Sequence, residues 1–277
     1  MRGFVPDYEL LAPSSLSEAL ALVEDGCRPF AGGTDLMVQL ESGRLAHKRF
    51  VLLWKLDELR GIGANNAEVR IGALTTYTEV RRSELLRREF PLLAQAAAET
   101  GGVATQNRGT LGGNIANASP AADSAPPLLV YDAELELVSR AGIRRRPYHG
   151  FHTGYKQIDL EPGELIRAII LPRGRSRWRE TFRKVGTRNA QAISKVCLAA
   201  AARCEGGRIR QIRIALGSVA PVPLRCVAAE SALAGAAAGS VPDFPMEARP
   251  VSDIRSTADY RSKVARRLVE DFLRSLG

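Results

Sequence analysis

Residues 104–127 read ATQNRGTLGGNIANASPAADSAPP, a segment rich in glycine, asparagine, serine and proline. These residue types are typical of turns and loops, and a loop of this length in a compact domain is usually functional or disordered. The segment carries little charge and contains interspersed leucine and isoleucine, which favours order. It therefore predicts an ordered binding loop in the middle of the chain.

Two Gly-Gly sequences stand out, Thr110-Leu111-Gly112-Gly113-Asn114 in this segment and Ala31-Gly32-Gly33-Thr34-Asp35 before it. Glycine permits left-handed backbone and close approach to a ligand, and successive N–H groups in such a turn form a concave site for anions. Two turns of this kind suit a pyrophosphate, although a single Gly-Gly is common in plain turns. The P-loop and the three-glycine dinucleotide fingerprint are absent, so a phosphate ligand is not expected in either standard site.

Helix and strand signals alternate before the segment, and strand signals dominate after it. Helices are expected after Ser15 and after Thr76, each with a glutamate three residues on, and over Pro91–Thr100. Before residue 174, strands are expected over 28–30, 50–54, 69–71 and 128–138. After it, strands are expected over 179–185, 195–203 and 209–219, followed by a C-terminal helix capped by Ser256. We place a domain boundary near residue 174.

Composition limits the kinds of protein that this chain can be. It has 277 residues, 45% hydrophobic and 25% charged, which is enough for a packed core in one large or two smaller domains. It shows neither an apolar run of the roughly 18 residues that span a membrane nor a signal peptide, so we expect a cytoplasmic protein without a membrane span. The four cysteines are isolated, and His149 and His152 have no companion ligands, so we expect no metal site.

The net charge of +9 has two interpretations. Arginines cluster at 144–146 and over 173–188, and in a strand Arg173, Arg175, Arg177 and Arg179 would share one face. Such clusters suit nucleic acid or another polyanion. We favour a solvated or partner-facing surface, because no aromatic platform for bases accompanies the charge. No nucleophile elbow or histidine-assisted set is evident, so we assign no catalytic residue and expect any hard chemistry to belong to a cofactor.

Taken together, six segments resemble the FAD-binding subunits of the xanthine dehydrogenase and carbon monoxide dehydrogenase family. They occur in the family's order and cover nearly the whole chain. The segments are RPFAGGTDL (28–36), NRGTLGGNIANASPAAD (107–123), FHTGYKQIDLEPGELI (151–166), FRKVGTRNAQAISKV (182–196), LGSVAPVPLR (216–225) and DIRSTADYR (253–261). The chain lacks the cysteine-rich iron–sulfur insertion that some relatives carry in this subunit.

The resemblance implies an α+β fold. Residues 1–174 would form the two-subdomain FAD-binding fold of vanillyl-alcohol-oxidase-type flavoproteins, with subdomains over about 1–56 and 57–174. Residues 175–277 would form a small α+β domain with a three-stranded antiparallel sheet and helices.

It also implies residues that hold FAD. Those around the pyrophosphate would be Pro29, Phe30, Ala31, Gly32, Gly33, Thr34, Asp35 and Leu36 on one side, and Thr110, Gly112, Gly113 and Asn114 on the other, toward the ribityl chain. Asp123 would point toward the adenosine ribose, Ile166 would pack beside the adenine, and Lys184 would lie near the flavin ring. Tyr155 lies in a segment that can approach the flavin face in this family.

The implied function is electron transfer through FAD in a molybdenum hydroxylase complex. A large molybdenum-cofactor subunit would oxidise the substrate, a small subunit with two [2Fe–2S] clusters would pass the electrons on, and NAD or another acceptor would take them from FAD. A dimer of heterotrimers is expected. The alternatives are a free-standing flavin oxidase of the same fold and a basic polyanion-binding module.

Overall fold

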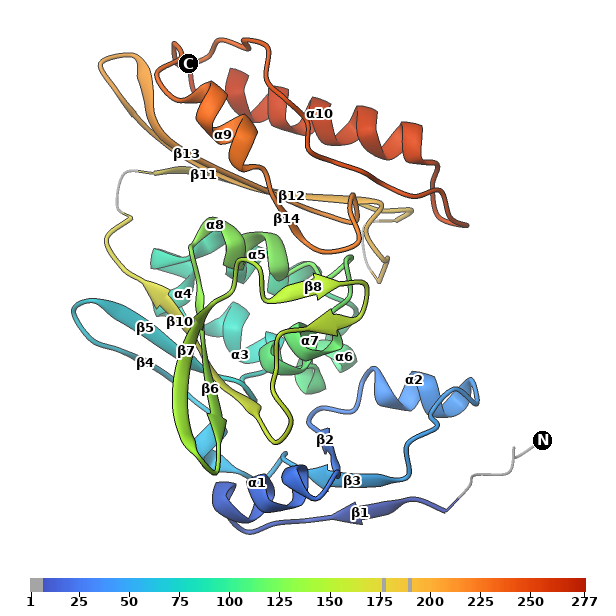
Figure 1. The fold of residues 1–277 in the computed structure, drawn as a ribbon. Helices are drawn as coiled ribbons and strands as arrows, with labels where there is room; N and C mark the ends of the chain where they lie inside the picture. The colour runs from blue at the N-terminus through green and yellow to red at the C-terminus, as the bar shows by residue number, and fades with distance from the viewer. Residues whose placement is uncertain (1–6, 176–177, 189–190) are drawn as a thin grey trace.

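The computed structural model describes residues 7–175, 178–188 and 191–277, whose three main sheets lie one above another along the molecule (Figure 1). The N-terminal sheet is at one end, a helix-covered sheet is in the middle, and the C-terminal sheet with its two helices is at the other end. Helices and strands are mixed throughout, as an α+β fold requires.

The N-terminal sheet is parallel, in the order β1-β3-β2. Its elements are β1 (Glu9–Leu11), α1 (Leu16–Glu24), β2 (Arg28–Phe30), α2 (Leu36–Glu41) and β3 (Arg49–Leu52). Ser15 caps α1 by accepting from the Glu18 N–H, but the Glu18 carboxylate bonds to Ser14, so the expected reciprocal capping box is not formed. Ala19 and Leu20 of α1 pack in one apolar cluster with Val51 of the central strand, so the helix buries the apolar face of this sheet.

The middle sheet is antiparallel, in the order β4-β5-β10-β6-β7. Its strands are β4 (Ile62–Ala64), β5 (Glu68–Gly72), β6 (Glu134–Ser139), β7 (Gly142–Pro147) and β10 (Leu165–Pro172), with the turn η1 (Asp57–Leu59) before them and the hairpin β8 (His152–Gly154) and β9 (Gln157–Ile158) beside them. The helices are α3 (Tyr77–Arg82), α4 (Glu84–Glu89), α5 (Pro91–Glu99), α6 (Val103–Arg108), α7 (Leu111–Asn117) and α8 (Ala125–Val130). The expected capping box of Thr76 and Glu79 is present at α3.

The prediction of a long loop over 104–127 was wrong, because much of that segment is helical. Thr110 caps α7 by accepting from the Gly113 N–H, and Pro126 and Pro127 occupy the first turn of α8, where proline loses no helical hydrogen bond. Gly112 lies inside α7 because the helix packs closely on Ala73: a Cβ at Gly112 would be 2.6 Å from the Ala73 Cβ. The glycines and prolines here serve close packing and helix starts.

The C-terminal sheet is antiparallel, in the order β11-β12-β13-β14. Its elements are β11 (Arg179–Val185), β12 (Val196–Glu205), β13 (Arg208–Gly217), β14 (Leu224–Arg225), α9 (Val227–Leu233) and α10 (Ala258–Arg274). The three expected strands are present, and the two-residue β14 adds a fourth that was not predicted. Within the described residues, no helix has both the length and the apolar character needed to cross a membrane.

Strand β12 is buried on both faces, which explains its unbroken apolar sequence. Cys197 and Ala199 face the core of the middle sheet, whereas the alternating residues Val196, Leu198 and Ala200 face the core under α9 and α10. This alternation follows from the two-residue period of a strand. The C-terminal sheet therefore shares its core with the helices of the middle layer on one side.

Three local predictions need correction. The predicted strand 128–138 begins as the end of α8 and becomes β6 only at Glu134. Thr257, not Ser256, caps α10, because its side chain accepts from the Tyr260 N–H. Residues 173–175 are not strand, so the condition under which four alternating arginines would share one face is not met there; Arg177 lies outside the described residues.

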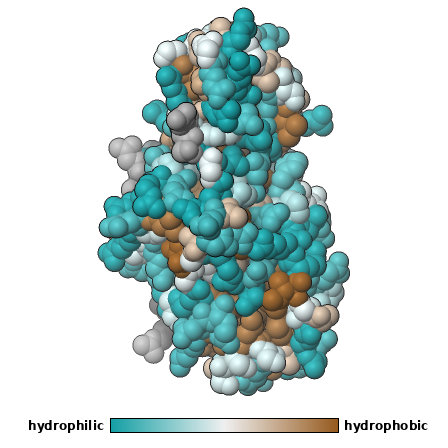
Figure 2. Space-filling view, turned by 90° about the vertical axis from the view of Figure 1, so that its left-hand side faces the viewer, coloured by the Kyte–Doolittle hydropathy of each residue, from teal (hydrophilic) through white to brown (hydrophobic). Residues whose placement is uncertain are grey.

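The face in Figure 2 is mostly hydrophilic, with separate hydrophobic spots. The exposed large apolar side chains include Val38, Tyr155 and Ile254, and Ile254 is 99% exposed. The four cysteines are free thiols, as predicted, and three of them are buried.

Candidate functional site

The turn after β2 carries a row of unused backbone donors. Gly33 has a φ of +77°, a left-handed value that glycine adopts without strain. In the described part of the chain, no hydrogen bond uses the N–H groups of Gly32, Gly33, Thr34 or Asp35. Consecutive N–H groups around a left-handed residue form a concave site for an anion. We call residues 31–35 the nest.

The nest packs directly on the segment before α7, although the two are far apart in sequence. A Cβ on Gly32 would lie 1.7 Å from the Arg108 carbonyl oxygen, so only glycine fits there. A Cβ on Gly113 would lie 3.9 Å from the Ala31 Cβ. The two Gly-Gly sequences are thus brought together, and β2 and α2 approach α6 and α7 in Figure 1.

The second Gly-Gly sequence does not form a second nest. The Gly112 N–H donates to the Ala73 carbonyl oxygen at 2.9 Å, and the Gly113 N–H donates to the Thr110 hydroxyl oxygen at 3.1 Å. Asn114 accepts from the Ser124 hydroxyl at 2.7 Å, while its side-chain NH₂ group has no hydrogen-bond partner among the residues that the structure describes. This side of the site therefore offers the Asn114 side chain, and its glycines allow close packing.

A network of hydrogen-bonded side chains, which the sequence did not predict, borders the nest. The Asn117 side-chain NH₂ donates to Asp35 Oδ1 at 3.2 Å, and Lys156 Nζ donates to both oxygens of Asn117, at 2.7 and 2.9 Å. Lys156 lies in the turn between β8 and β9, next to the exposed Tyr155. No local sequence pattern joins these residues, because they come from three separate elements.

The predicted residues Asp123 and Lys184 meet in a buried ion pair. Lys184 Nζ lies 2.7 Å from Asp123 Oδ2, with the two side chains 7% and 8% exposed, and it also donates to the Glu99 carbonyl oxygen at 2.8 Å. Burial raises the pKa of Asp123, and the Lys184 ammonium opposes that rise. The resemblance assigns the two residues to different parts of the cofactor, whereas in the structure their side chains contact each other.

The second carboxylate oxygen of Asp123 is also buried. Asp123 Oδ1 is buried and accepts no well-formed hydrogen bond in the described structure, although the Ser194 hydroxyl is close enough to lower the pKa of this carboxyl. An unsatisfied buried carboxylate oxygen is costly unless a donor reaches it. The same ion pair lies beside the buried Cys197, whose thiol pKa burial raises.

The remaining predicted residues surround the nest or lie in the core. The Phe30 ring lies under Gly33, where an added Cβ would be 2.7 Å from its Cζ atom, and it packs edge-on against Phe50. Ile166 is 7% exposed in the core of the middle sheet. Arg108 covers the ring of Trp54 at 3.7 Å, a stacking contact that the sequence did not predict.

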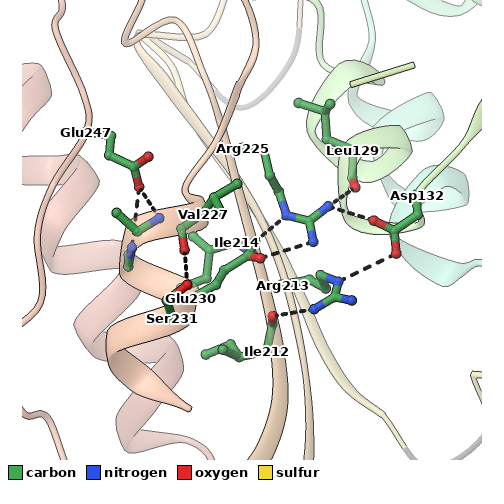
Figure 3. Close-up of polar contacts among 12 residues, drawn as sticks. Leu129, Asp132, Ile212, Arg213, Ile214, Arg225, Val227, Glu230, Ser231 and Glu247 are labelled. Carbon is green, nitrogen blue, oxygen red and sulfur yellow. Dashed lines mark hydrogen bonds and ion pairs between the residues drawn. The ribbon is translucent and has the colours of Figure 1, made fainter. Parts of the chain in front are cut away.

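A polar cluster joins the middle and C-terminal layers away from the nest (Figure 3). Buried Arg225 pairs with Glu230 and with Asp132, and it donates to the Leu129 carbonyl oxygen. Asp132 also pairs with Arg175 at 2.6 Å. The cluster fastens α8 to β14 and α9, so it has a structural role.

A hollow lies beside this cluster and not at the nest. It measures about 460 Å³ and is lined by none of the predicted cofactor residues. Its walls include His149, Arg210 and Arg213. We place the functional site at the nest, because unused donors and close glycine packing are found there, whereas Arg225 of the cluster is engaged by Glu230, Asp132 and Leu129 (Figure 3).

Several arginines of the two arginine-rich segments are paired with carboxylates. Arg144, Arg145 and Arg146 on edge strand β7 pair with carboxylates across the sheet. Arg173 pairs with Glu89, and this arginine, then Arg88, lowers the Glu89 pKa to about 2. His152 Nε2 donates to the Ile115 carbonyl oxygen, and the described residues contain no cluster of three metal-ligating side chains.

Two family models together match nearly the whole chain. Residues 6–174 match the family described as the FAD binding domain in molybdopterin dehydrogenase. Residues 180–276 match the carbon monoxide dehydrogenase flavoprotein C-terminal domain. The first match contains the nest, α7 and Lys156.

Individual relatives agree with these matches. The chain is 37% identical over 221 residues to the xanthine dehydrogenase FAD-binding subunit of Escherichia coli O157:H7, which covers 78% of this chain and 76% of that one. It is 30% identical over 280 residues to the carbon monoxide dehydrogenase medium chain of Hydrogenophaga pseudoflava, covering 96% and 95%.

Solved structures show the same fold. The carbon monoxide dehydrogenase from Hydrogenophaga pseudoflava that lacks the Mo-pyranopterin moiety superposes with a TM-score of 0.89 at 30% identity, covering 97% of this chain and 96% of that one. Quinoline 2-oxidoreductase from Pseudomonas putida 86 superposes with a TM-score of 0.88 at 26% identity, covering 99% and 98%.

Proposed function

This chain belongs to the family of FAD-binding subunits of molybdenum hydroxylases, and on that premise we propose that its FAD carries electrons from the [2Fe–2S] clusters of a small partner subunit to NAD or another acceptor. In this scheme a large molybdenum-cofactor subunit oxidises the substrate, and the complex is a dimer of heterotrimers. FAD supplies the redox chemistry; the chain binds it, orients it and sets its electrostatic surroundings.

The nest is the main support for the proposed location of the cofactor. Its four unused N–H groups point to a bound anion, and the fit of Gly32 against Arg108 holds the turn in place. We assign the FAD pyrophosphate to this turn, within the segment Pro29–Leu36. Hydrogen bonds from backbone N–H groups to a charged acceptor are each worth about 1.5–3 kcal/mol.

The other assignments follow from the surroundings of the nest. Asn114 donates to the far side of the diphosphate or the ribityl chain, and Thr110, Gly112 and Gly113 hold α7 in position for it. Asp123 lies toward the adenosine ribose, and the Lys184 ammonium paired with it opposes the rise in its pKa. Ile166 packs beside the adenine.

We also propose the finer architecture that this function implies. Residues 1–56 and 57–174 form the two subdomains of a vanillyl-alcohol-oxidase-type FAD-binding fold, and 175–277 form the C-terminal domain. The three separate sheets, formed by strands of 9–52, of 62–172 and of 179–225, support this division. A cytoplasmic location completes the proposal.

Purification of the tagged chain from its native cells tests the partners and the electron route. We expect two other subunits to co-purify with molybdenum, iron and FAD, and NADH added without oxygen to bleach the flavin absorption near 450 nm. A yellow chain that purifies alone and oxidises a small alcohol would establish the free-standing oxidase instead. A colourless chain that is retained on DNA in a salt-dependent manner would establish the polyanion-binding module.

A further inference from the structure

The turn that forms the proposed phosphate site also carries a carboxylate. Asp35 supplies one of the four unused N–H groups of the nest, and its exposed carboxylate accepts from the Gln39 and Asn117 side chains. A carboxylate close to a diphosphate opposes its binding, since like charges within a few ångströms repel. The turn is suited to an anion only if this charge is offset.

The structure places one lysine where it offsets the charge. Lys156 Nζ donates to Asn117 Oδ1 at 2.7 Å, and the side-chain NH₂ of Asn117 donates to Asp35 Oδ1 at 3.2 Å. Burial lowers the pKa of Lys156, and the Asp35 carboxylate opposes that change, so the two charges interact through the intervening amide. Lys156 also has a φ of +58°, an uncommon value outside glycine and asparagine. The strained turn positions this side chain at the end of α7.

We propose that Lys156 is a positioning residue for the cofactor: it neutralises Asp35 across Asn117 and thereby allows the nest to accept the FAD diphosphate. This inference rests on the proposed location of FAD at the nest. A purely structural alternative exists, in which Lys156 only caps the C-terminal end of α7 through the Asn117 carbonyl oxygen, at 2.9 Å. The two roles differ in what happens when Asp35 is also neutralised.

A double-mutant cycle separates these roles. FAD is titrated into the flavin-free full chain of the wild type, Lys156→Gln, Asp35→Asn and the double variant, and binding is followed by flavin fluorescence. We expect Lys156→Gln to weaken FAD binding about tenfold, as one partly screened charge near a diphosphate implies. The double variant should recover to within about threefold of the wild type, because the neutral pair no longer repels phosphate.

Lys263→Gln is the matched control. It removes the same charge from an exposed ion pair with Asp259 on α10, away from the nest, and should leave FAD affinity unchanged. The melting temperature of each flavin-free variant shows whether α7 has been weakened.

The outcomes are distinct. Loss of affinity in Lys156→Gln that Asp35→Asn does not restore, with a lowered melting temperature, assigns Lys156 to helix capping and overturns the proposal. Equal affinity of Lys156→Gln and wild type also overturns it, while leaving FAD binding in place. A wild-type chain that does not bind FAD contradicts the proposed function itself.

Discussion

Replacing Gly32 with alanine places a methyl carbon 1.7 Å from the Arg108 carbonyl oxygen and 2.6 Å from its carbonyl carbon. Both are backbone atoms, so no side-chain rotation can relieve the contact, and ordinary van der Waals separation begins at 3.4 Å. The turn must therefore move away from α6 by well over an ångström. That displacement redirects the N–H groups of the nest.

The structure sets the size of the effect. Overpacking at a tight contact destabilises a fold by about 1–3 kcal/mol. A misdirected N–H group forfeits a hydrogen bond to a charged acceptor, worth about 1.5–3 kcal/mol, so FAD binding should weaken by roughly ten- to a hundredfold for each donor lost. Gly32→Ala should therefore weaken FAD binding at least tenfold and also lower the melting temperature of the flavin-free chain.

Fluorescence titration of FAD measures the affinity, and circular dichroism measures the melting temperature without flavin. Gly63→Ala is the control, because an added Cβ there meets no atom within 4 Å and the backbone φ is not left-handed. The reasoning is refuted if folded Gly32→Ala binds FAD as tightly as Gly63→Ala does.

Four further substitutions test the fold. Arg225→Ala should destabilise the chain by about 3–5 kcal/mol in urea unfolding, because buried Glu230 loses its charged partner; a loss below 1 kcal/mol would contradict this. Glu89 is protonated only near pH 2 in the folded chain but near its ordinary pKa of 4.5 when unfolded, so its stabilisation is complete above about pH 4.5 and lost toward pH 2. Glu89→Gln should flatten the fall of unfolding free energy across that window, and an unchanged slope would count against the ion pair. Thr257→Ala should lower the unfolding free energy by about 1 kcal/mol and Ser256→Ala by much less. The reverse order would show that Ser256 caps α10, as the sequence predicted.

Features that depend on neighbouring residues were predictable from the sequence. The N-caps Ser15 and Thr76 follow from a glutamate three residues on, although only Thr76 and Glu79 complete the capping box, and β12 follows from an unbroken apolar run. The Gly32-Gly33 turn was also recognised correctly as a place of left-handed backbone, because that property belongs to glycine itself.

Features that depend on distant residues were not predictable from composition and spacing. Gly112 reads as a loop residue until Ala73 is seen against α7, where only glycine leaves room. Lys156 reads as a surface lysine until the hairpin places it on Asn117. The family resemblance named Asp123 and Lys184, but their pairing required the C-terminal sheet to be packed on the middle layer.

A structure of the FAD-loaded chain would show directly where the diphosphate binds. We predict that the diphosphate oxygens lie within about 3.2 Å of at least two backbone nitrogens of the nest, the usual limit for such hydrogen bonds. A diphosphate bound elsewhere, with the N–H groups of residues 32–35 facing solvent, would contradict the account.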